Sequence, residues 1–347
     1  MSTTPHETTA GELAPTAPKA AAFTFGDPVP VTSLRDVVYE GLWRGSDDWY
    51  EPPVSLSLLA KTYRATPHHG SALQVKRNIL VKTFRPHPLL SRATFAALAL
   101  DYLVFANAYL EQRRNRLGGA LPMARRAAKY VRRGGEFGER YWWVHNYIDR
   151  VELPGDRMIH MMEPDIDQDI YGVPDYLGTL QSVWVNEAAT LFRRKYYLNG
   201  SHAGFILYLS DAQQNEDDID ALRTALKEAK GPGNFRNLFL YSPNGKKDGV
   251  QVIPVSEVAA KDEFLNIKNV SRDDQLAGHR IPPQLMGIIP NNTGGFGDIE
   301  KAARVFVANE LEPLQAKLLE INDAVGEEIL RFDPYTLAEP PATPALV

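Results

Sequence analysis

Apolar residues recur at helical spacing in several stretches of the chain. In Ser91–Phe105 they fall on one face of a helix, and the serine at the start can cap the first turn. Pro174–Leu198 has a similar apolar stripe and ends in a basic turn before Gly200, which favours a helix stop. The same criteria predict helices over residues 53–61, 69–83, 210–230, 261–278 and 298–330, the last with a kink at Pro313.

The pattern changes to that of β-strands between residues 107 and 162. Short aromatic and β-branched runs, such as residues 141–144, lie between Gly118-Gly119, Gly134-Gly135 and Pro154-Gly155, which are typical of turns. This part of the chain is expected to be a small β-rich insert. Further strands are predicted at 204–209, 235–241 and 250–255, so the chain as a whole is predicted to be α+β.

Both ends of the chain are poor in residues that can form a core. Residues 1–22 are rich in Thr, Ala and Pro, and residues 333–347 contain several prolines and small residues. Such segments bury too little apolar surface to offset their loss of conformational entropy. We therefore expect a disordered N-terminal tail over 1–22 and a flexible C-terminal tail over 333–347.

Composition narrows the possible functions. The chain has 347 residues, a net charge of −5 and no cysteine, which excludes disulfides and thiolate chemistry. The most apolar stretch, 95–110, is interrupted by Asp101 and Asn107 and is too short to span a bilayer. The N-terminus lacks the pattern of a secretory signal. We expect a soluble chain that is made in the cytosol and does not hold nucleic acid tightly, because strong phosphate binding needs a surplus of positive charge.

One basic run stands out against this acidic background. It carries eight Lys or Arg residues and no acid between positions 113 and 133. Such a run can contact a phosphate backbone or an acidic partner, or it can be a solvated face of the β-insert. A membrane-surface helix is disfavoured by the Gly-Gly pairs on both sides.

Catalytic motifs are not found. Gly294–Gly297 before a predicted helix is a weak match to a phosphate loop, but the Lys-Ser/Thr of such loops is missing and Asp298 and Glu300 would repel phosphate. The histidines are scattered and do not pair with carboxylates at metal-binding spacing. We expect no catalytic residues, no cofactor and no metal.

One long stretch carries a specific resemblance. Ser271–Ala302 includes Ile-Pro-Pro-Gln-Leu-Met-Gly at 281–287 and a Gly/Asn loop, and it is followed by Asn-Glu-Leu-Glu-Pro-Leu-Gln at 309–315. In this order the elements resemble the core of the PBSX-type portal family of tailed phages. Weaker matches at 105–110, 169–177 and 194–204 extend the likeness to about residues 50–332.

The resemblance implies the portal fold: wing, stem helices, a β-rich clip, a channel loop and a long kinked helix, with a small or absent crown because the chain ends soon after Phe332. The parts that it implies are a wing over 23–90 and 201–286, stem helices over 91–106 and 173–200, a clip over 107–172, a channel loop over 287–297 and the long helix over 298–332.

The resemblance also implies a function. Portal subunits form a ring, usually a dodecamer, at one capsid vertex, through which double-stranded DNA is packaged and ejected. The implied partners are the terminase large subunit, neck proteins, and the major capsid and scaffolding proteins, with assembly in the host cytoplasm and no membrane. A structural role in the virion is therefore expected, not an enzyme. The alternative is a cytosolic DNA-binding or adaptor protein that uses the basic run.

Site residues follow from the same resemblance. Pro282, Pro283 and Gly287 are expected to form a structural turn. The expected channel-loop residues are Asn291, Asn292, Thr293, Gly294, Gly295, Phe296 and Gly297. The expected clip contacts to DNA or terminase are Arg113, Arg114, Arg116, Arg125, Arg126, Lys129, Arg132 and Arg133.

Overall fold

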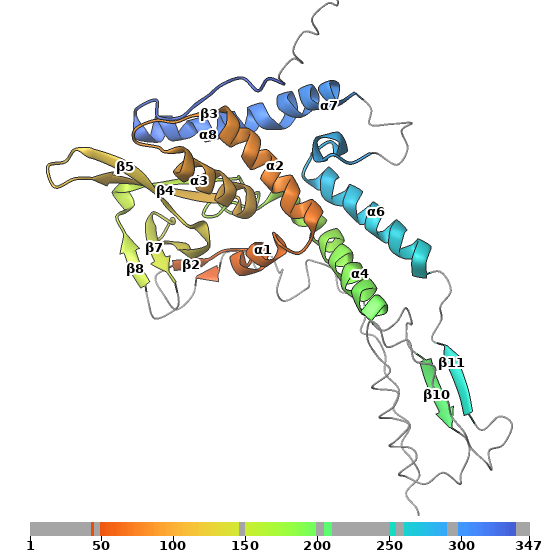
Figure 1. Ribbon diagram of the computed structural model, residues 1–347. Helices are drawn as coiled ribbons and strands as arrows, with labels where there is room; N and C mark the ends of the chain where they lie inside the picture. The colour runs from red at the N-terminus through yellow and green to blue at the C-terminus, as the bar shows by residue number, and fades with distance from the viewer. Residues whose placement is uncertain are drawn as a thin grey trace, which may run out of the picture.

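The computed structural model describes residues 43–44, 49–145, 150–198, 205–209, 250–254, 260–289 and 298–337. Figure 1 shows a body of helices and small sheets from which two helices extend side by side. The predicted α+β class is confirmed. The predicted tail over 1–22, the helix over 210–230, the strand over 235–241 and residues 338–347 lie outside the described residues.

Three helices begin the body, and each starts after a hydroxyl side chain that accepts a backbone N–H three residues on. These N-caps are Ser55, Thr66 and Ser91, so the cap predicted at Ser91 is confirmed. The helices are α1 (Leu56–Thr62), α2 (Pro67–Thr83) and α3 (Arg92–Phe105). The predicted helices over 53–61 and 69–83 are thus present, with starts shifted by a few residues.

Two antiparallel sheets are built mainly from residues between 107 and 162, where the sequence predicts strands, and the larger one also includes two short strands that precede α1. Their tight turns need glycine at Gly118 and Gly135, whose φ angles are 85° and 86°. The smaller sheet has the order β5-β4-β9 and the larger β1-β2-β6-β7-β8. The strands are β1 (Trp43–Arg44), β2 (Trp49–Glu51), β4 (Asn107–Arg114), β5 (Ala120–Arg126), β6 (Val131–Gly134), β7 (Arg140–Val144), β8 (Arg150–Leu153) and β9 (Met158–Met162).

The β-rich segment predicted between residues 107 and 162 shares a sheet with a strand from earlier in the chain. Trp49 of β2 pairs with Gly134 of β6, so the larger sheet includes strands from before and after α3. Helix α3 itself is enclosed: Phe95 and Leu98 have no exposed surface, and the helix packs against α2, β4 and β5. With so many buried positions, the helix lies inside the body. The strand pattern was correct locally, but it does not show which distant strand becomes the partner.

Helix α3 also connects two hydrophobic cores. It contributes Phe95, Leu98 and Tyr102 to a core shared with α2, β4 and the C-terminal helix α8 (Glu312–Val325). Its end contributes Val104 and Phe105 to a second core, shared with α1 and the larger sheet. Helix α2 and strands β4 and β9 also contribute to both cores, so the two cores form one continuous body around α3.

The two extended helices are α4 (Leu180–Leu198) and α6 (Ala260–Gly278), which run antiparallel. The first turns of the helix predicted from Pro174 are a 3₁₀ segment, Asp175–Thr179. Beyond the far ends of the pair, β10 (Phe205–Leu209) and β11 (Val250–Pro254) form an antiparallel ladder. The strands predicted at 204–209 and 250–255 and the helix predicted over 261–278 are confirmed.

The C-terminal helix differs from the single helix predicted over 298–330. It begins as α7 (Ile299–Phe306), passes through a π-helical turn (Val307–Leu311) and continues as α8. It ends five residues early because Gly326, with φ 77°, closes its last turn. The chain then forms β12 (Arg331–Phe332), which pairs with β3 (Phe84–Arg85) next to α2.

Candidate functional site

Most of the basic run is tied into the body. Arg125 donates two hydrogen bonds to Asp101, from Nε to Oδ2 at 2.7 Å and from Nη2 to Oδ1 at 2.5 Å. Asp101 lies on α3, is 2% exposed and also accepts the backbone N–H of Ala128 at 3.0 Å. Burial raises the pKa of Asp101, and the hydrogen bonds and charge of Arg125 act in the opposite direction. This ion pair thus joins β5 to the central helix.

The neighbouring cations are held in similar ways. Arg126 binds Glu111 on the adjacent strand, and Arg132 binds Glu51 at 3.0 Å. Arg133 donates to the carbonyl of Gly138 and contacts His160, and its guanidinium lies over the Tyr141 ring. Lys129 lies 5.6 Å from the centre of the Tyr130 ring. The acidic partners, Glu111 and Glu51, lie outside the run. The sequence of the run alone therefore does not predict these ion pairs.

Three of the eight cations remain at the surface. Arg113, Arg114 and Arg116 are exposed at the tip of the β4–β5 hairpin, and within the described residues no hydrogen bond or ion pair holds their side chains. Asn115 shapes this tip by accepting the N–H groups of Leu117 and Gly119. The basic run is therefore two different features: a structural part in the sheets and a free, positively charged hairpin tip.

A second constellation lies where α3 passes into β4. Asn107, 2% exposed, donates to the carbonyls of Phe105 and Gly172 at 2.8 and 2.7 Å and accepts from the N–H of Gly172 at 2.8 Å. Its carbonyl also contacts Nε2 of His160 at 2.9 Å. A Cβ at Gly172 would lie 2.0 Å from the carbonyl oxygen of Ala106, so this close backbone approach requires glycine.

A third constellation lies at the end of α6, just before the predicted structural turn. Arg280 has a left-handed backbone (φ 53°) at the position where helix ends favour glycine. Its side chain binds Asp175 at 3.1 Å and reaches Glu310 in the π-helical turn at 3.5 Å. Glu310 also binds Lys76 of α2 at 3.0 Å. We call Lys76, Asp175, Arg280 and Glu310 the junction network.

The junction network lies beside a cavity of about 360 Å³. Tyr102, Glu163 and Lys317 contribute to its lining, together with the network itself. Burial lowers the pKa of Lys76, and the charge of Glu310 opposes this. Helices α2 and α6 and the π-helical turn are thus connected by charge at one point.

The predicted turn and kink residues lie on either side of this network. Pro283–Met286 forms a 3₁₀ turn that starts after Pro282 and is closed by Gly287, whose φ is 70°. Pro313 lies in the first turn of α8, directly after the π-helical turn. Because proline has no N–H for the preceding turn, its position explains why regular helical bonding is interrupted there. The predicted channel-loop residues Asn291 to Gly297 lie outside the described residues.

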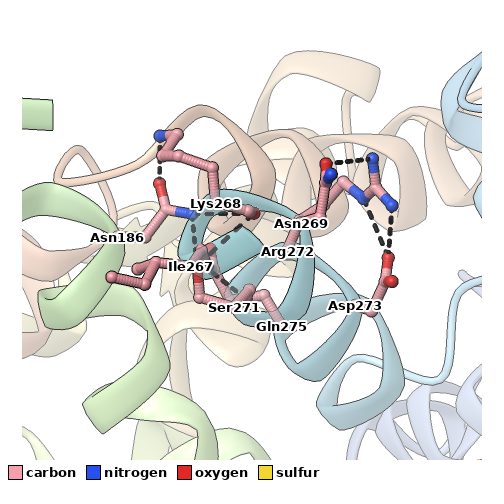
Figure 2. A network of polar contacts seen from close by, with 8 residues as sticks. All are labelled: Asn186, Ile267, Lys268, Asn269, Ser271, Arg272, Asp273 and Gln275. Atoms are coloured by element: carbon pink, nitrogen blue, oxygen red, sulfur yellow. Dashed lines mark hydrogen bonds and ion pairs between the residues drawn. The ribbon is translucent and has the colours of Figure 1, made fainter. Parts of the chain in front are cut away.

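Helices α4 and α6 contact each other through polar side chains (Figure 2). Asn186 and Gln275 have no exposed surface, and Ser271 is 4% exposed. Asn186 donates to Ser271 at 2.6 Å and accepts from Lys268, which also donates to Thr190. Gln275 donates to the carbonyl of Ser271 at 2.8 Å and lies 2.6 Å from Thr66 of the α2 cap. These bonds fix the register of the pair and tie it to the body.

Two negative findings concern the described residues only. No group of three or more His, Cys, Asp or Glu side chains in them is arranged to hold a metal ion. Among the same residues, no helix is both long and apolar enough to cross a bilayer.

Comparisons with known proteins agree with one another. The phage portal protein family matches residues 56–332. A probable portal protein of Escherichia phage P2 is 52% identical over 320 residues, covering 92% of this chain and 93% of the relative. A probable portal protein of Haemophilus phage HP1 is 37% identical over 297 residues, covering 84% and 86%.

The solved structures that resemble the chain share its fold. One is the neck of a native gene transfer agent particle computed with C12 symmetry, with a TM-score of 0.56 and 17% identity over 80% of this chain and 83% of that one. Another is an HK97 family phage portal protein from Corynebacterium diphtheriae, with a TM-score of 0.57 and 13% identity over 79% and 94%. With the family match over most of its length and a relative at 52% identity, the chain belongs to the phage portal protein family.

Proposed function

We propose that the protein is the portal subunit of a tailed phage, which forms a ring at one capsid vertex and conducts double-stranded DNA during packaging and ejection. The observation that carries this proposal is the portal family match over residues 56–332. The likeness in fold to a neck structure computed with C12 symmetry supports a ring of identical subunits. The role is structural, and the acidic net charge of −5 suits a passage that must not retain DNA.

The arrangement of the helices favours a different division into portal parts from the one expected from the sequence. Helices α4 and α6 extend together from the body, whereas α3 is enclosed within it (Figure 1). We therefore assign the stem to α4 and α6 and the clip to the segment that joins them, residues 199–259. Residues 107–172, which share both cores with α3, then belong to the wing.

We keep residues 287–297 as the proposed channel loop, in agreement with the resemblance. This proposal is supported by the loop's position in the chain, between the end of α6 and the start of α7. Glycine, asparagine and threonine in such a loop allow changes of shape with few strong contacts to DNA. The partners of the ring are proposed to be the terminase large subunit, neck proteins, and the major capsid and scaffolding proteins, with assembly in the host cytoplasm.

The second candidate, a cytosolic DNA-binding or adaptor protein, has little in its favour. That candidate would bind DNA or an acidic partner through the basic run, yet five of the eight cations in the run have partners within the body. Only Arg113, Arg114 and Arg116 remain as candidates for contact with DNA or an acidic partner.

Phage that lack this gene test the proposed function. We expect their heads to contain no DNA, because a head without a portal has no passage for the genome. Supplying the chain in trans should restore DNA-filled heads with a ring at one vertex, seen by electron microscopy. Heads that fill with DNA in the absence of the chain would contradict the proposal and favour the adaptor.

A further inference from the structure

Helices α4 and α6 bury polar side chains between them and expose apolar side chains on their outer surfaces, the reverse of the usual arrangement. The surface between the helices is polar, with Asn186, Ser271 and Gln275 buried there (Figure 2). The outer surfaces expose Val185 (48%), Leu191 (52%), Leu265 (60%) and Val270 (62%) instead. A helix on the surface of a monomer normally turns its apolar stripe inward and its polar side to water. The outer surfaces of this pair therefore suit contact with another protein.

Helix geometry sorts the exposed apolar residues onto two opposite faces of the pair. Hydrogen bonds from Ser182 to Asp274 and from Asn186 to Ser271 fix the antiparallel register and the direction in which the helices face each other. At 3.6 residues per turn, Leu191 and Leu265 then project to one side of this two-helix layer. Val185 and Val270 project to the other side.

The first side is an extension of the surface that packs on the body. Leu180, Val183 and Leu276 lie on that side and are buried near the base of the pair. Further out, where the body ends, Leu191 and Leu265 lie on the same side but are exposed. We call this exposed pair the body-side patch, and Val185 with Val270 the outer patch.

We propose that the body-side patch of one subunit packs on the outer patch of the next. A contact between two different faces of identical chains is heterologous, and it closes into a ring when the rotation between copies permits. The two patches lie on opposite faces of the pair, as the two surfaces of such a contact must, and the likeness to a neck structure computed with C12 symmetry favours a second copy of the chain as the occupant. This inference rests on the proposed ring and names the surfaces that form it.

Paired glutamate substitutions in the full-length chain test the contact. One variant carries Leu191→Glu and Leu265→Glu, the second Val185→Glu and Val270→Glu, and serine at the same positions gives a milder second set. The control carries Leu117→Glu and Ile166→Glu, which are 96% and 98% exposed elsewhere on the body. The mass of each is measured by light scattering, and circular dichroism checks the fold. We expect the fraction of each patch variant that forms rings to fall at least about ten-fold, because a buried, unpaired carboxylate is costly. The control should form rings like the unsubstituted chain.

Mixing the two patch variants gives the sharper result. Each has one intact patch, so an equimolar mixture should form a one-to-one heterodimer and nothing larger. The heterodimer also shows that both variants are folded. Rings that persist in both variants, a mixture that stays monomeric, or stable homodimers of a single variant would overturn the inference. An unsubstituted chain that forms no ring would instead count against the proposed function.

Discussion

Replacing Arg125 by alanine is expected to lower the free energy of unfolding by about 3 kcal/mol, because it leaves a buried carboxylate without its partner. Asp101 is 2% exposed, and its remaining hydrogen bond in the described structure comes from the backbone N–H of Ala128. Arg125→Lys should fall between the wild type and Arg125→Ala, since lysine keeps the charge but not the two-armed geometry. Urea unfolding followed by tryptophan fluorescence measures the effect.

The hairpin tip provides the matched control. Arg113, Arg114 and Arg116 belong to the same basic run but are exposed, so replacing all three by alanine should change the free energy of unfolding by less than about 0.5 kcal/mol. A larger loss at the tip than at Arg125 would contradict the division of the run into two parts. A packaging defect of Arg125→Ala would then reflect a weakened subunit, whereas the same defect in the stable tip variant would indicate contact with DNA or a partner.

Stability is expected to fall steeply as the pH drops below about 6.5. His69 and His279 lie together against the Tyr176 ring of the second core, with Nε2 of His279 2.8 Å from Nδ1 of His69. Burial lowers the pKa of His69 to about 4 and, with the nearby His69 and Lys76, that of His279 to about 2. Burial also holds the pKa of His160 well below its usual range.

The sign follows from proton uptake. Below pH 6.5 the unfolded chain protonates these histidines and the folded chain does not, so acid favours the unfolded state. For His69 alone the loss is roughly 3 kcal/mol between pH 7 and pH 4, at about 1.4 kcal/mol per pH unit. Only one proton can lie between Nε2 of His279 and Nδ1 of His69. The two histidines therefore cannot both be protonated while this contact is kept.

Unfolding midpoints from pH 7.5 to pH 4.5 measure this effect. His279→Gln should flatten the dependence, whereas His145→Gln, at an exposed ring, should leave it unchanged. A midpoint that is constant over this range would show that these histidines bind protons equally well in the folded and unfolded chain.

The elements of the fold were largely predictable from the sequence. Capping serine and apolar spacing identified α3, and glycine pairs identified the turns at Gly118 and Gly135. These signals are local, because they arise from backbone conformations and side chains a few residues apart. The π-helical turn directly before Pro313 was not predicted; its Glu310 binds Lys76 of α2, a contact between residues far apart in the sequence.

Contacts between residues far apart in the sequence were not predictable. The run at 113–133 contains no acid, yet Asp101 and Glu111 before it and Glu51 far upstream neutralise three of its arginines. The enclosed position of α3 was missed for the same reason, since an amphipathic pattern shows that a face is buried but not what buries it. The resemblance to portal proteins supplied the family, while the distribution of the parts needed the packing of α3, α4 and α6.

The mass and shape of the purified full-length protein test the central claim most directly. Light scattering together with negative-stain electron microscopy should show a ring of about twelve subunits with a central hole, as expected for closed heterologous contacts. A monomer or dimer that persists at high protein concentration, with the subunit folded, would contradict the portal account.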